Sequence, residues 1–403
     1  MSDTAANLRA QFPLLAAAPE LHYLDSAATA QIHRAALDAV VSHETTRRAN
    51  VMRGTYRLAE AADLAYERAR QSVARFLNAG SAGEIVFTSG ATASLNLVAH
   101  AFGSTLKAGD RVLVSVAEHH SNFVPWQMLR DRCGIELALI PVGADGRLDL
   151  ARLPGLMGDR CRLVAVTQCS NVTGAWTDVA AIVAAARKLG ARVLLDGAQA
   201  VQHGPQDVRA MDVDFYAFSG HKCFGPGGVG VLWGKAEALA RMPPFLGGGG
   251  MIAEVTPAAS TWAAPPQRFE AGTPPIAQVV GLAAAVEWMM TLEWAAIRER
   301  EDALCKQLIE GLARIPGLRL LGPQRGKRAP IVSFDIPGLH PHDICQVLDT
   351  RNLALRGGHH CAQPLLAALG AESCTRASIA LYNDEADIEA LLAGLGHVLR
   401  ELA

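Results

Sequence analysis

The chain has 403 residues, of which 50% are hydrophobic and 19% charged, and its formal net charge is −2. This length and composition predict a globular protein of two domains, and the small charge offers no electrostatic attraction for nucleic acid or a membrane surface. The start shows no basic segment followed by an apolar one, and no apolar run reaches the ~20 residues of a membrane-spanning helix. Eight cysteines are scattered without a C-x-x-C pair. That argues against a disulfide framework or a zinc knuckle and fits a reducing cytoplasm.

Short apolar strands alternate with helical stretches through the middle of the chain. We expect strands at 84–87, 111–116, 162–167, 192–195 and 213–218, and helices at 93–99 and 180–189. Strands that alternate with helices indicate βαβ units and a mostly parallel sheet, whose ligands bind at the carboxyl ends of the strands.

The last part of the chain predicts a second, smaller domain. The glycines at 247–250 and the prolines at 265 and 266 indicate loops. A helical run from Val279 to Leu312 then leads out of the sheet domain. A strand at 331–334 and a closing helix from Glu385 belong to the C-terminal domain.

An acidic and a basic side chain each close a predicted strand. One apolar strand leads into Asp196, and another leads into Ser219-Gly220-His221-Lys222. Pyridoxal phosphate (PLP) needs such a pair, because a lysine amine bonds covalently to its aldehyde and a carboxylate keeps its ring nitrogen protonated. Ser219 and His221 are donors suited to a phosphate or a phenolate oxygen. A lone lysine after a strand is usually an ordinary surface residue, and the preceding Asp196 argues against that here.

The turn after the first strand is a candidate phosphate site. Ser89-Gly90-Ala91-Thr92 opens the helix at 93–99, and the free N–H groups at a helix N-terminus bind anions. Ala91 and Thr92 would face the phosphate, Thr92 with its hydroxyl. Serine and threonine also cap helices routinely, so only Lys222 and Asp196 favour the phosphate interpretation.

Two further strand ends carry polar side chains. Glu118-His119-His120-Ser121-Asn122 follows the strand at 111–116, and the imidazole of His119 can stack on a cofactor ring and move protons. Neighbouring histidines rarely face one metal and no third ligand has suitable spacing, so no metal is expected. Asn171 follows the strand at 162–167. It could donate to the cofactor phenolate or a substrate carboxylate, and a turn residue is the alternative.

A second reactive segment is Arg356-Gly357-Gly358-His359-His360-Cys361. Its arginine and histidines favour the thiolate form of Cys361, and its glycines suggest a flexible arm that carries the thiol to a substrate. A free cysteine is usually buried and inert, but this polar setting argues against burial. Farther on, Arg376 suits bidentate binding of an amino-acid carboxylate, with a surface salt bridge as the alternative.

Together these segments resemble a group II (SUF-type) cysteine desulfurase or selenocysteine lyase of the class V aminotransferase family. The resemblance covers nearly the whole chain. It implies an α/β protein of PLP fold type I, like aspartate aminotransferase, and a homodimer with sites at the interface. It further implies a large domain over 20–280 and a smaller α+β domain over 1–19 and 281–403 that includes the Cys361 arm. The most specific segments are 118–122, 196–200, Ser219-Gly220-His221-Lys222, Phe269-Glu270-Ala271-Gly272-Thr273-Pro274 and Gly358-His359-His360-Cys361-Ala362.

The resemblance also implies a role for each candidate. Lys222 carries PLP, Asp196 pairs with its ring nitrogen, and His119 stacks on the ring and assists proton transfer. Cys361 accepts the sulfur. The phenolate side of the cofactor is held by Gln199 and Asn171. The phosphate is held by Ala91, Thr92, Ser219 and His221, with Thr273 reaching in from the other subunit. The substrate is bound by Arg376, Arg356, Asn171 and Ala28.

The implied reaction converts L-cysteine to L-alanine, leaves a persulfide on Cys361 and passes sulfur to an acceptor protein or thiol, for iron–sulfur cluster assembly or another pathway. Two alternatives remain. One is a selenocysteine lyase or another class V PLP enzyme in which Cys361 is incidental, and the other is a non-catalytic sulfur-transfer scaffold. The chain departs from the family pattern at Met52, where a histidine is usual, so we expect slow turnover with cysteine alone. It also departs at Ser89-Gly90-Ala91-Thr92-Ala93 and Gly225-Pro226-Gly227-Gly228.

Overall fold

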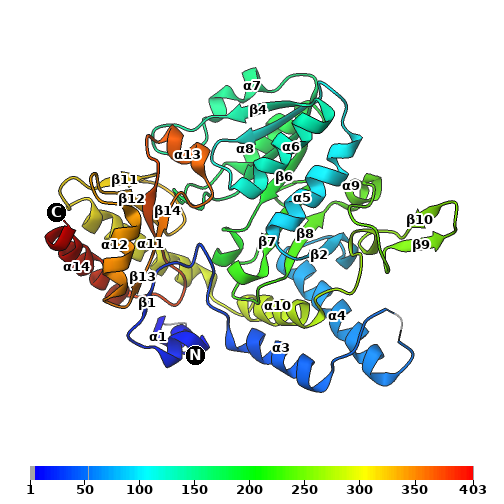
Figure 1. The fold of residues 1–403 in the computed structure, drawn as a ribbon, viewed down its shortest axis with the longest axis horizontal. Coiled ribbons are helices and arrows are strands. Elements are labelled where there is room, and N and C mark those ends of the chain that lie inside the picture. The colour runs from blue at the N-terminus through cyan, green and yellow to red at the C-terminus, as the bar shows by residue number, and fades with distance from the viewer. Residues whose placement is uncertain (1–4, 53, 403) are drawn as a thin grey trace.

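Two β-sheets organise the chain (Figure 1), which the computed structural model describes over residues 5–52 and 54–402. The larger sheet has seven strands in the order β2-β8-β7-β6-β5-β3-β4. Strands β3 to β7 pair in parallel, whereas β8 is antiparallel to its neighbours β7 and β2. The predicted α/β class with a mostly parallel sheet is confirmed. The strands are β2 (Ile85–Thr88), β3 (Arg111–Ser115), β4 (Glu136–Ile140), β5 (Cys161–Thr167), β6 (Arg192–Asp196), β7 (Phe215–Ser219) and β8 (Gly230–Gly234).

Helices cover both faces of the large sheet, which is why its strands read as continuous apolar runs. In β5, Val164 and Val166 join one buried cluster, whereas Leu163 and Ala165 join a second cluster on the opposite face. The first cluster includes side chains of α4 (Arg57–Phe76), α8 (Val179–Lys188) and α10 (Ile276–Met289), and the second those of α5 (Ala91–Ala101) and α6 (Val124–Cys133). The remaining helices here are α3 (Arg34–Thr46), α7 (Leu153–Leu156) and α9 (Ala236–Arg241).

The smaller sheet is antiparallel and lies at the other end of the molecule (Figure 1). Its order is β11-β12-β15-β14, with β11 (Arg319–Leu321), β12 (Ile331–Asp335), β14 (Arg356–Gly358) and β15 (Cys374–Ser378). Its own buried cluster contains side chains of α11 (Trp294–Leu312), α12 (Pro341–Asp349) and α14 (Glu385–Leu402). The short helix α13 (Gln363–Ala368) follows the Cys361 segment.

The predicted helical run from Val279 to Leu312 is wrong in one respect, because it is two helices. α10 ends at Met289, α11 begins at Trp294, and their axes are bent by 89°. Apolar periodicity continues through both helices, but α10 packs on α3 and α4 while α11 packs on β12 and α14. No single helix of the described chain is long and apolar enough to cross a membrane, and α10 and α11 meet such criteria only as this bent pair.

The N-terminal segment contacts both regions. Its helices α1 (Ala5–Arg9) and α2 (Pro13–Ala17) bury Leu8 and Leu15 in the large-domain cluster, where Phe12 contacts Phe224 and Tyr382. The next strand, β1 (His22–Tyr23), pairs in parallel with β13 (Leu353–Ala354) of the C-terminal region. The predicted division at residues 19 and 280 stays a prediction.

A β-hairpin that the sequence did not predict projects from the large domain (Figure 1). It consists of β9 (Ile252–Val255) and β10 (Ser260–Trp262) and lies between the two predicted loops.

The carboxyl ends of six strands, β2 to β7, lie at one edge of the large sheet. β2 runs in the same direction as β7, because both are antiparallel to β8. Strands β3, β5, β6 and β7 are parallel to one another. The chain segments that follow β2, β3, β5, β6 and β7 therefore leave the sheet on the same side.

Candidate active site

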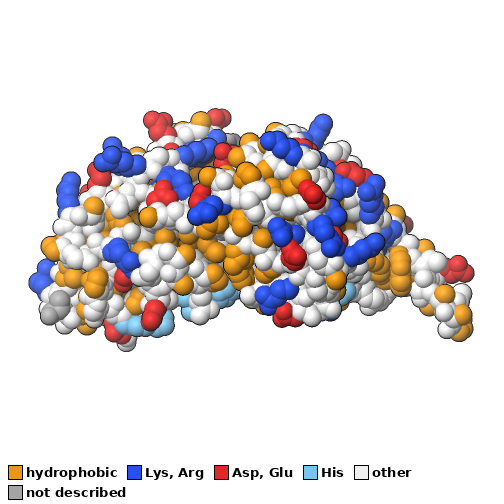
Figure 2. Space-filling model, turned by 90° about the horizontal axis from the view of Figure 1, so that it is seen from above, with side chains coloured by type: hydrophobic (Ala, Val, Ile, Leu, Met, Phe, Trp, Pro, Cys, Tyr) orange, Lys and Arg blue, Asp and Glu red, His pale blue; other side chains and the backbone are white. Residues whose placement is uncertain are grey.

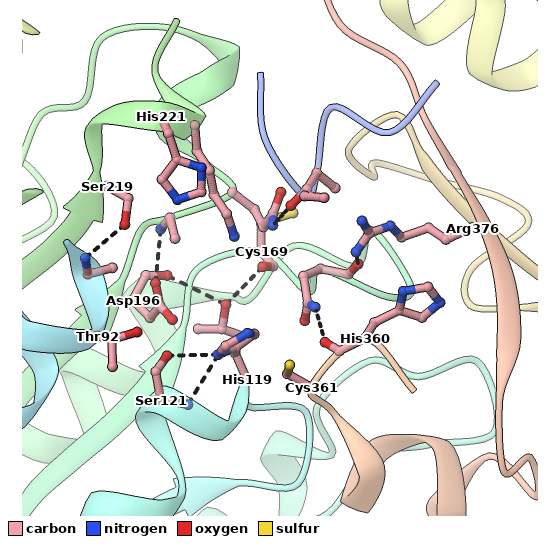
Figure 3. Close-up of a pocket in the computed structure, with 18 of the residues that line it drawn as sticks. Thr92, His119, Ser121, Cys169, Asp196, Ser219, His221, His360, Cys361 and Arg376 are labelled. Atoms are coloured by element: carbon pink, nitrogen blue, oxygen red, sulfur yellow. Dashed lines mark hydrogen bonds between the residues drawn. The ribbon is translucent and has the colours of Figure 1, made fainter. Parts of the chain in front are cut away.

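A pocket lies where this edge meets the C-terminal region. Figure 3 shows Ser219 and Thr92 at one end, Arg376, His360 and Cys361 at the other, and Asp196 and His119 between them. Every predicted site residue except Thr273 lines it. The predicted residues are Ala28, Ala91, Thr92, His119, Asn171, Asp196, Gln199, Ser219, His221, Lys222, Arg356, Cys361 and Arg376.

Lys222 and Asp196 come from neighbouring parallel strands. Asp196 is the last residue of β6, and Lys222 ends the 3-10 turn Gly220–Lys222 that follows β7. Burial lowers the pKa of the Lys222 amine to about 8, although the charge of Asp196 opposes this shift. Burial also raises the pKa of Asp196, against a 3.0 Å hydrogen bond from the Ala198 N–H and the charge of Lys222. The amine is thus readily deprotonated, and the buried carboxylate favours a cationic partner.

His119 is held in one tautomer. Its Nδ1 accepts a hydrogen bond from the backbone N–H of Ser121 at 3.1 Å and lies 2.8 Å from the Ser121 hydroxyl. A backbone N–H only donates, so the proton of the neutral ring resides on Nε2. Burial, followed by the charge of Lys222, lowers the pKa of His119 to about 3. The ring is therefore neutral near pH 7 and offers an N–H donor.

Donor groups gather at the Ser219 end of the pocket. The Ser219 hydroxyl oxygen accepts a 2.8 Å hydrogen bond from the Ala91 N–H, which leaves the Ser219 proton free to be donated. Ala91 and Thr92 form the first turn of α5, whose N–H groups and dipole favour an anion. Burial, with the charge of Lys222, lowers the pKa of His221 to about 4, so this ring is also neutral at pH 7.

Arg376 lies at the other end with its side chain 2% exposed. It donates from Nη1 to the Asn171 carbonyl at 3.0 Å and from Nη2 to the Asp25 carboxylate at 2.8 Å. Asp25 was not a predicted site residue, and it supplies the counter-charge that a buried guanidinium requires. The alternative of a surface salt bridge for Arg376 is wrong, because the guanidinium is buried.

Cys361 sits at the tip of a tight turn. His360 and Cys361 have φ of +50° and +55°, and the Ala362 N–H donates to the His359 carbonyl at 2.9 Å, as in a type I′ turn. Such φ values are unfavourable for residues other than glycine. Three contacts hold them: Asn171 Nδ2 donates to the His360 carbonyl, the His120 N–H donates to the Cys361 carbonyl, and His360 Nε2 bonds the Cys374 carbonyl.

These contacts bear on two expectations. The arm before Cys361 is not a free glycine segment, since Arg356–Gly358 forms β14 and pairs with β15. The Asn171 amide, predicted to donate to a cofactor or substrate, also donates to the arm; its role toward a ligand stays a prediction. Cys361 itself is half-buried, as its polar surroundings suggested.

The pocket fits PLP. The Gln199 side-chain oxygen and Arg376 Nε are buried without a hydrogen-bond partner among the described residues, so the chain leaves polar atoms for a bound molecule. A deprotonatable lysine, a buried carboxylate, a neutral imidazole and a helix N-terminus also match an aldehyde, a ring nitrogen, a ring face and a phosphate. In the described ranges, no group of three or more His, Cys, Asp or Glu side chains is arranged to hold a metal ion.

Two singled-out positions lie elsewhere. Thr273 is near Asn50, whose amide is 3.4 Å from the Thr273 hydroxyl, and it lines a separate surface hollow. Met52 is 39% exposed and does not line the pocket, and its neighbour Arg53 lies outside the described residues. Conversely, Ser121 and Thr167 line the pocket without having been assigned a role.

Comparison with known proteins gives the same answer as the site. The profile described as Aminotransferase class-V matches residues 22–391. The chain belongs to the class V aminotransferase family. A class V relative, a cysteine desulfurase of Serratia proteamaculans, is 44% identical over 100% of both chains. Another, from Dickeya dadantii, is 46% identical over 98% of this chain and 97% of its own.

Solved class V structures share the fold. The cysteine desulfurase CsdA (S-sulfonic acid) from Escherichia coli has a TM-score of 0.93 and 41% identity, with 99% of each chain covered. A C-DES mutant with glycine covalently linked to its PLP cofactor has a TM-score of 0.80 and 28% identity, covering 96% of this chain and 98% of its own. The predicted family, fold and PLP cofactor are confirmed.

Proposed function

We propose that this class V enzyme is a cysteine desulfurase, which converts L-cysteine to L-alanine and collects the sulfur as a persulfide on Cys361. One observation carries the proposal: Lys222, Arg376 and Cys361, from three separate parts of the chain, line one pocket. A lysine that holds the cofactor and an arginine that binds the substrate carboxylate suffice for many PLP enzymes that act on amino acids. A half-buried thiol at the same pocket provides a nucleophile for sulfur.

We assign the cofactor contacts as follows. Lys222 would bond the PLP aldehyde, Asp196 would pair with the ring nitrogen, and His119 would cover the ring. The phenolate side belongs to Gln199, and the phosphate to Ala91, Thr92, Ser219 and His221. When bound, PLP supplies an electron-withdrawing ring that stabilises negative charge on the substrate carbon beside the carboxylate.

Each side chain of the pocket then has a separate role in the reaction. Arg376 binds the substrate carboxylate through its charge, beside Arg356, Asn171 and Ala28. Lys222 Nζ removes the proton from the neighbouring carbon, and the Nε2–H of His119 donates a hydrogen bond. Cys361 Sγ bonds to the substrate sulfur as the carbon–sulfur bond breaks. Protonation of the remaining three-carbon unit gives alanine, so that cysteine and one enzyme thiol become alanine and one persulfide.

The decisive experiment incubates the PLP-loaded enzyme with L-cysteine and a reductant and measures alanine and sulfide together. Equal amounts of the two products are expected. Cys361→Ser should lower both rates by at least about 100-fold, as loss of a nucleophile does. Cys133→Ser, at another half-buried cysteine, is the matched control and should retain wild-type rates. Undiminished desulfuration by Cys361→Ser would refute the role of Cys361 and favour an enzyme in which this cysteine is incidental.

The same pair of variants tests selenocysteine as the alternative substrate. Selenium leaves more readily than sulfur and depends less on an attacking thiol. If Cys361→Ser loses cysteine turnover but keeps selenocysteine turnover, Cys361 serves sulfur transfer. If the wild type releases selenium and no sulfide, the protein is a selenocysteine lyase.

We further propose a homodimer in which Thr273 completes the phosphate site of the other subunit. Apolar side chains are exposed at Met52 and between Tyr56 and Leu64, with Tyr56 at 55%, and on the projecting hairpin, where Val255 is 58% and Trp262 45% exposed. Figure 2 shows the hairpin standing out from the body at the right edge. Such surfaces mark protein–protein contacts.

Subunit mixing tests Thr273. Lys222→Ala and Thr273→Arg dimers should each be inactive. A mixed dimer restores one site, because intact Lys222 from one chain then meets intact Thr273 from the other. If mixing restores no activity although mixed dimers form, Thr273 does not act across the interface.

We propose that the Cys361 persulfide passes its sulfur by thiol exchange to an acceptor protein or a small thiol, with iron–sulfur cluster assembly as one destination. All eight cysteines are free thiols, which suits a reducing compartment such as the cytoplasm. Persulfide on Cys361, seen by mass spectrometry after a cysteine pulse, should disappear on addition of an acceptor thiol. Persistence of the added sulfur would contradict this step.

A further inference from the structure

Glu118 carries a buried carboxylate just outside the pocket. The residue is 0% exposed and does not line the cavity, although it directly precedes His119. Its Oε1 accepts a 2.9 Å hydrogen bond from the Thr167 N–H and a very short one from the Ser115 hydroxyl. Its Oε2 accepts a 2.6 Å hydrogen bond from the Asn122 amide. A buried carboxylate is costly unless it is bonded in this way.

The three partners come from different elements. Ser115 ends β3, Thr167 ends β5, and Asn122 ends the 3-10 turn His120–Asn122 that follows His119. Glu118 therefore ties two strand ends of the large sheet to the turn that carries the imidazole. The Glu118 side chain does not line the pocket, and it reaches the pocket through two neighbours: His119, and Thr167, whose backbone N–H it binds.

Asn122 makes two further hydrogen bonds besides the one to Glu118. The Asn122 N–H donates to the His119 carbonyl at 2.8 Å, and Asn122 Oδ1 accepts from the Trp126 indole N–H at 3.2 Å. Within the same turn, Ser121 fixes Nδ1 of the His119 ring. The orientation of the ring thus depends on the turn, and the turn is held by Glu118.

We propose that Glu118 is a positioning residue for His119, which keeps the turn His120–Asn122 in the orientation that presents the His119 Nε2–H to the pocket. The proposal rests on the proposed role of His119 beside the cofactor. It requires that both oxygens of Glu118 accept a hydrogen bond, since the Thr167 N–H and the Asn122 amide N–H only donate, whereas the Ser115 hydroxyl can donate or accept. Burial raises the pKa of Glu118 to about 8, and a proton on Oε1 directed at the Ser115 hydroxyl leaves both of these bonds in place.

The substitution Glu118→Gln breaks this pattern in either orientation of the new amide. If its NH2 group turned toward Thr167, it would face a backbone N–H that cannot reverse. If the NH2 group faced Asn122 instead, two amide donors would meet. Reversal of the Asn122 amide would only move the conflict to the Trp126 N–H. Two donors in contact leave both unpaired, which buried polar groups avoid.

A second substitution should repair the first. With Asn122→Asp added, the NH2 group of the new amide at position 118 donates to one oxygen of the new carboxylate at position 122, while the other oxygen accepts from the Trp126 N–H. The amide oxygen at position 118 then accepts from Thr167 and Ser115, as Oε1 of Glu118 does. The double variant reverses one donor and one acceptor and restores every hydrogen bond.

The test uses PLP-loaded wild type, Glu118→Gln and Glu118→Gln/Asn122→Asp, read by ¹⁵N NMR of the His119 ring and by the absorption spectrum of the bound cofactor. We expect Glu118→Gln to shift both signals and the double variant to return them to wild-type values. Glu301→Gln is the matched control: this carboxylate is also buried, bonds His203 and lies away from the pocket, so both signals should stay unchanged.

Two results would overturn the proposal: wild-type signals in Glu118→Gln, or shifted signals in the double variant. If Glu118→Gln does not fold, the double variant decides alone. A folded double variant with wild-type signals supports the proposal, and a double variant that also fails to fold refutes it. These readouts are independent of sulfide release, so a protein without desulfurase activity would refute the proposed function and leave this inference standing or falling on its own spectra.

Discussion

Glu270→Ala should strongly destabilise the protein, because Glu270 and Arg70 form a buried pair along an open sheet edge. Their side chains are 2% and 1% exposed and are joined by two hydrogen bonds of 2.7 and 2.9 Å. β2 is the last strand of the large sheet. On its free side the Arg70 guanidinium donates to the Ile85 carbonyl at 2.8 Å, and the Glu270 carboxylate accepts from the Phe87 N–H at 2.7 Å. The pair thus replaces a missing neighbour strand.

The expected loss of stability follows from the groups that Glu270→Ala leaves without a partner. Removing one partner of a buried pair leaves an uncompensated charge, which costs about 3–5 kcal/mol. The Phe87 N–H loses its acceptor as well, and an unpaired buried donor costs about 1–3 kcal/mol, so we expect the upper part of the first range. Glu67 offers a matched control. Its carboxylate also pairs with Arg70, at 3.5 Å, but is 51% exposed, so Glu67→Ala should cost at most about 1 kcal/mol.

Urea titration of the PLP-loaded proteins, followed by tryptophan fluorescence, measures both changes in the free energy of unfolding. Equal cofactor occupancy in all three proteins is needed, because a bound ligand adds its own stabilisation. The reasoning would be refuted if the Glu270→Ala and Glu67→Ala variants differed from each other by less than about 1 kcal/mol.

Three further predictions concern the site and the response to pH. Lys222→Ala should lose covalent PLP attachment and turnover, and borohydride treatment of the wild type should label the Lys222 peptide; a label on another lysine would contradict the assignment. Arg376→Ala should raise the KM for L-cysteine by about 10- to 100-fold, as expected for a lost charge-assisted hydrogen bond, and an unchanged KM would exclude Arg376 as the carboxylate ligand. Burial lowers the pKa of His33 to about 4. The folded protein keeps this ring neutral while the unfolded chain protonates below about pH 6.5, so wild-type stability should fall as pH drops from 6.5 to 4. His33→Gln should reduce that slope by up to about 1.4 kcal/mol per pH unit, and parallel urea midpoints for the two proteins from pH 4.5 to 7 would show that His33 does not titrate in this way.

The polar segments at strand ends could be read from the sequence because the information is local. Each of Asp196, Ser219 and Asn171 follows an apolar strand, and βαβ alternation makes those strands parallel. Parallel strands end at one edge, so residues far apart in the chain must meet there. The pocket residues on the large sheet were therefore predictable without knowledge of their distances.

The role of Thr273 and the domain boundary could not be checked in the same way, because the structure of a single chain tests neither of them. Thr273 lies outside the pocket of its own subunit, and a residue that acts across an interface gives no signal in one protomer. The exposed hairpin residues Val255 and Trp262 show only that a surface remains to be covered. These points stay predictions.

The sequence by itself determined the sheet, the family, and the lysine and carboxylate that line the pocket, because each depends on periodicity or on adjacent residues. Only the tertiary structure showed that Asp25 neutralises Arg376 across 351 residues, and that Asn171 holds the Cys361 turn. The bend between α10 and α11 also appears only in the tertiary structure. Both helices have the same periodic spacing of apolar residues and differ only in the elements they pack on. Contacts between distant segments depend on how the two sheets are placed, and no local pattern records that placement.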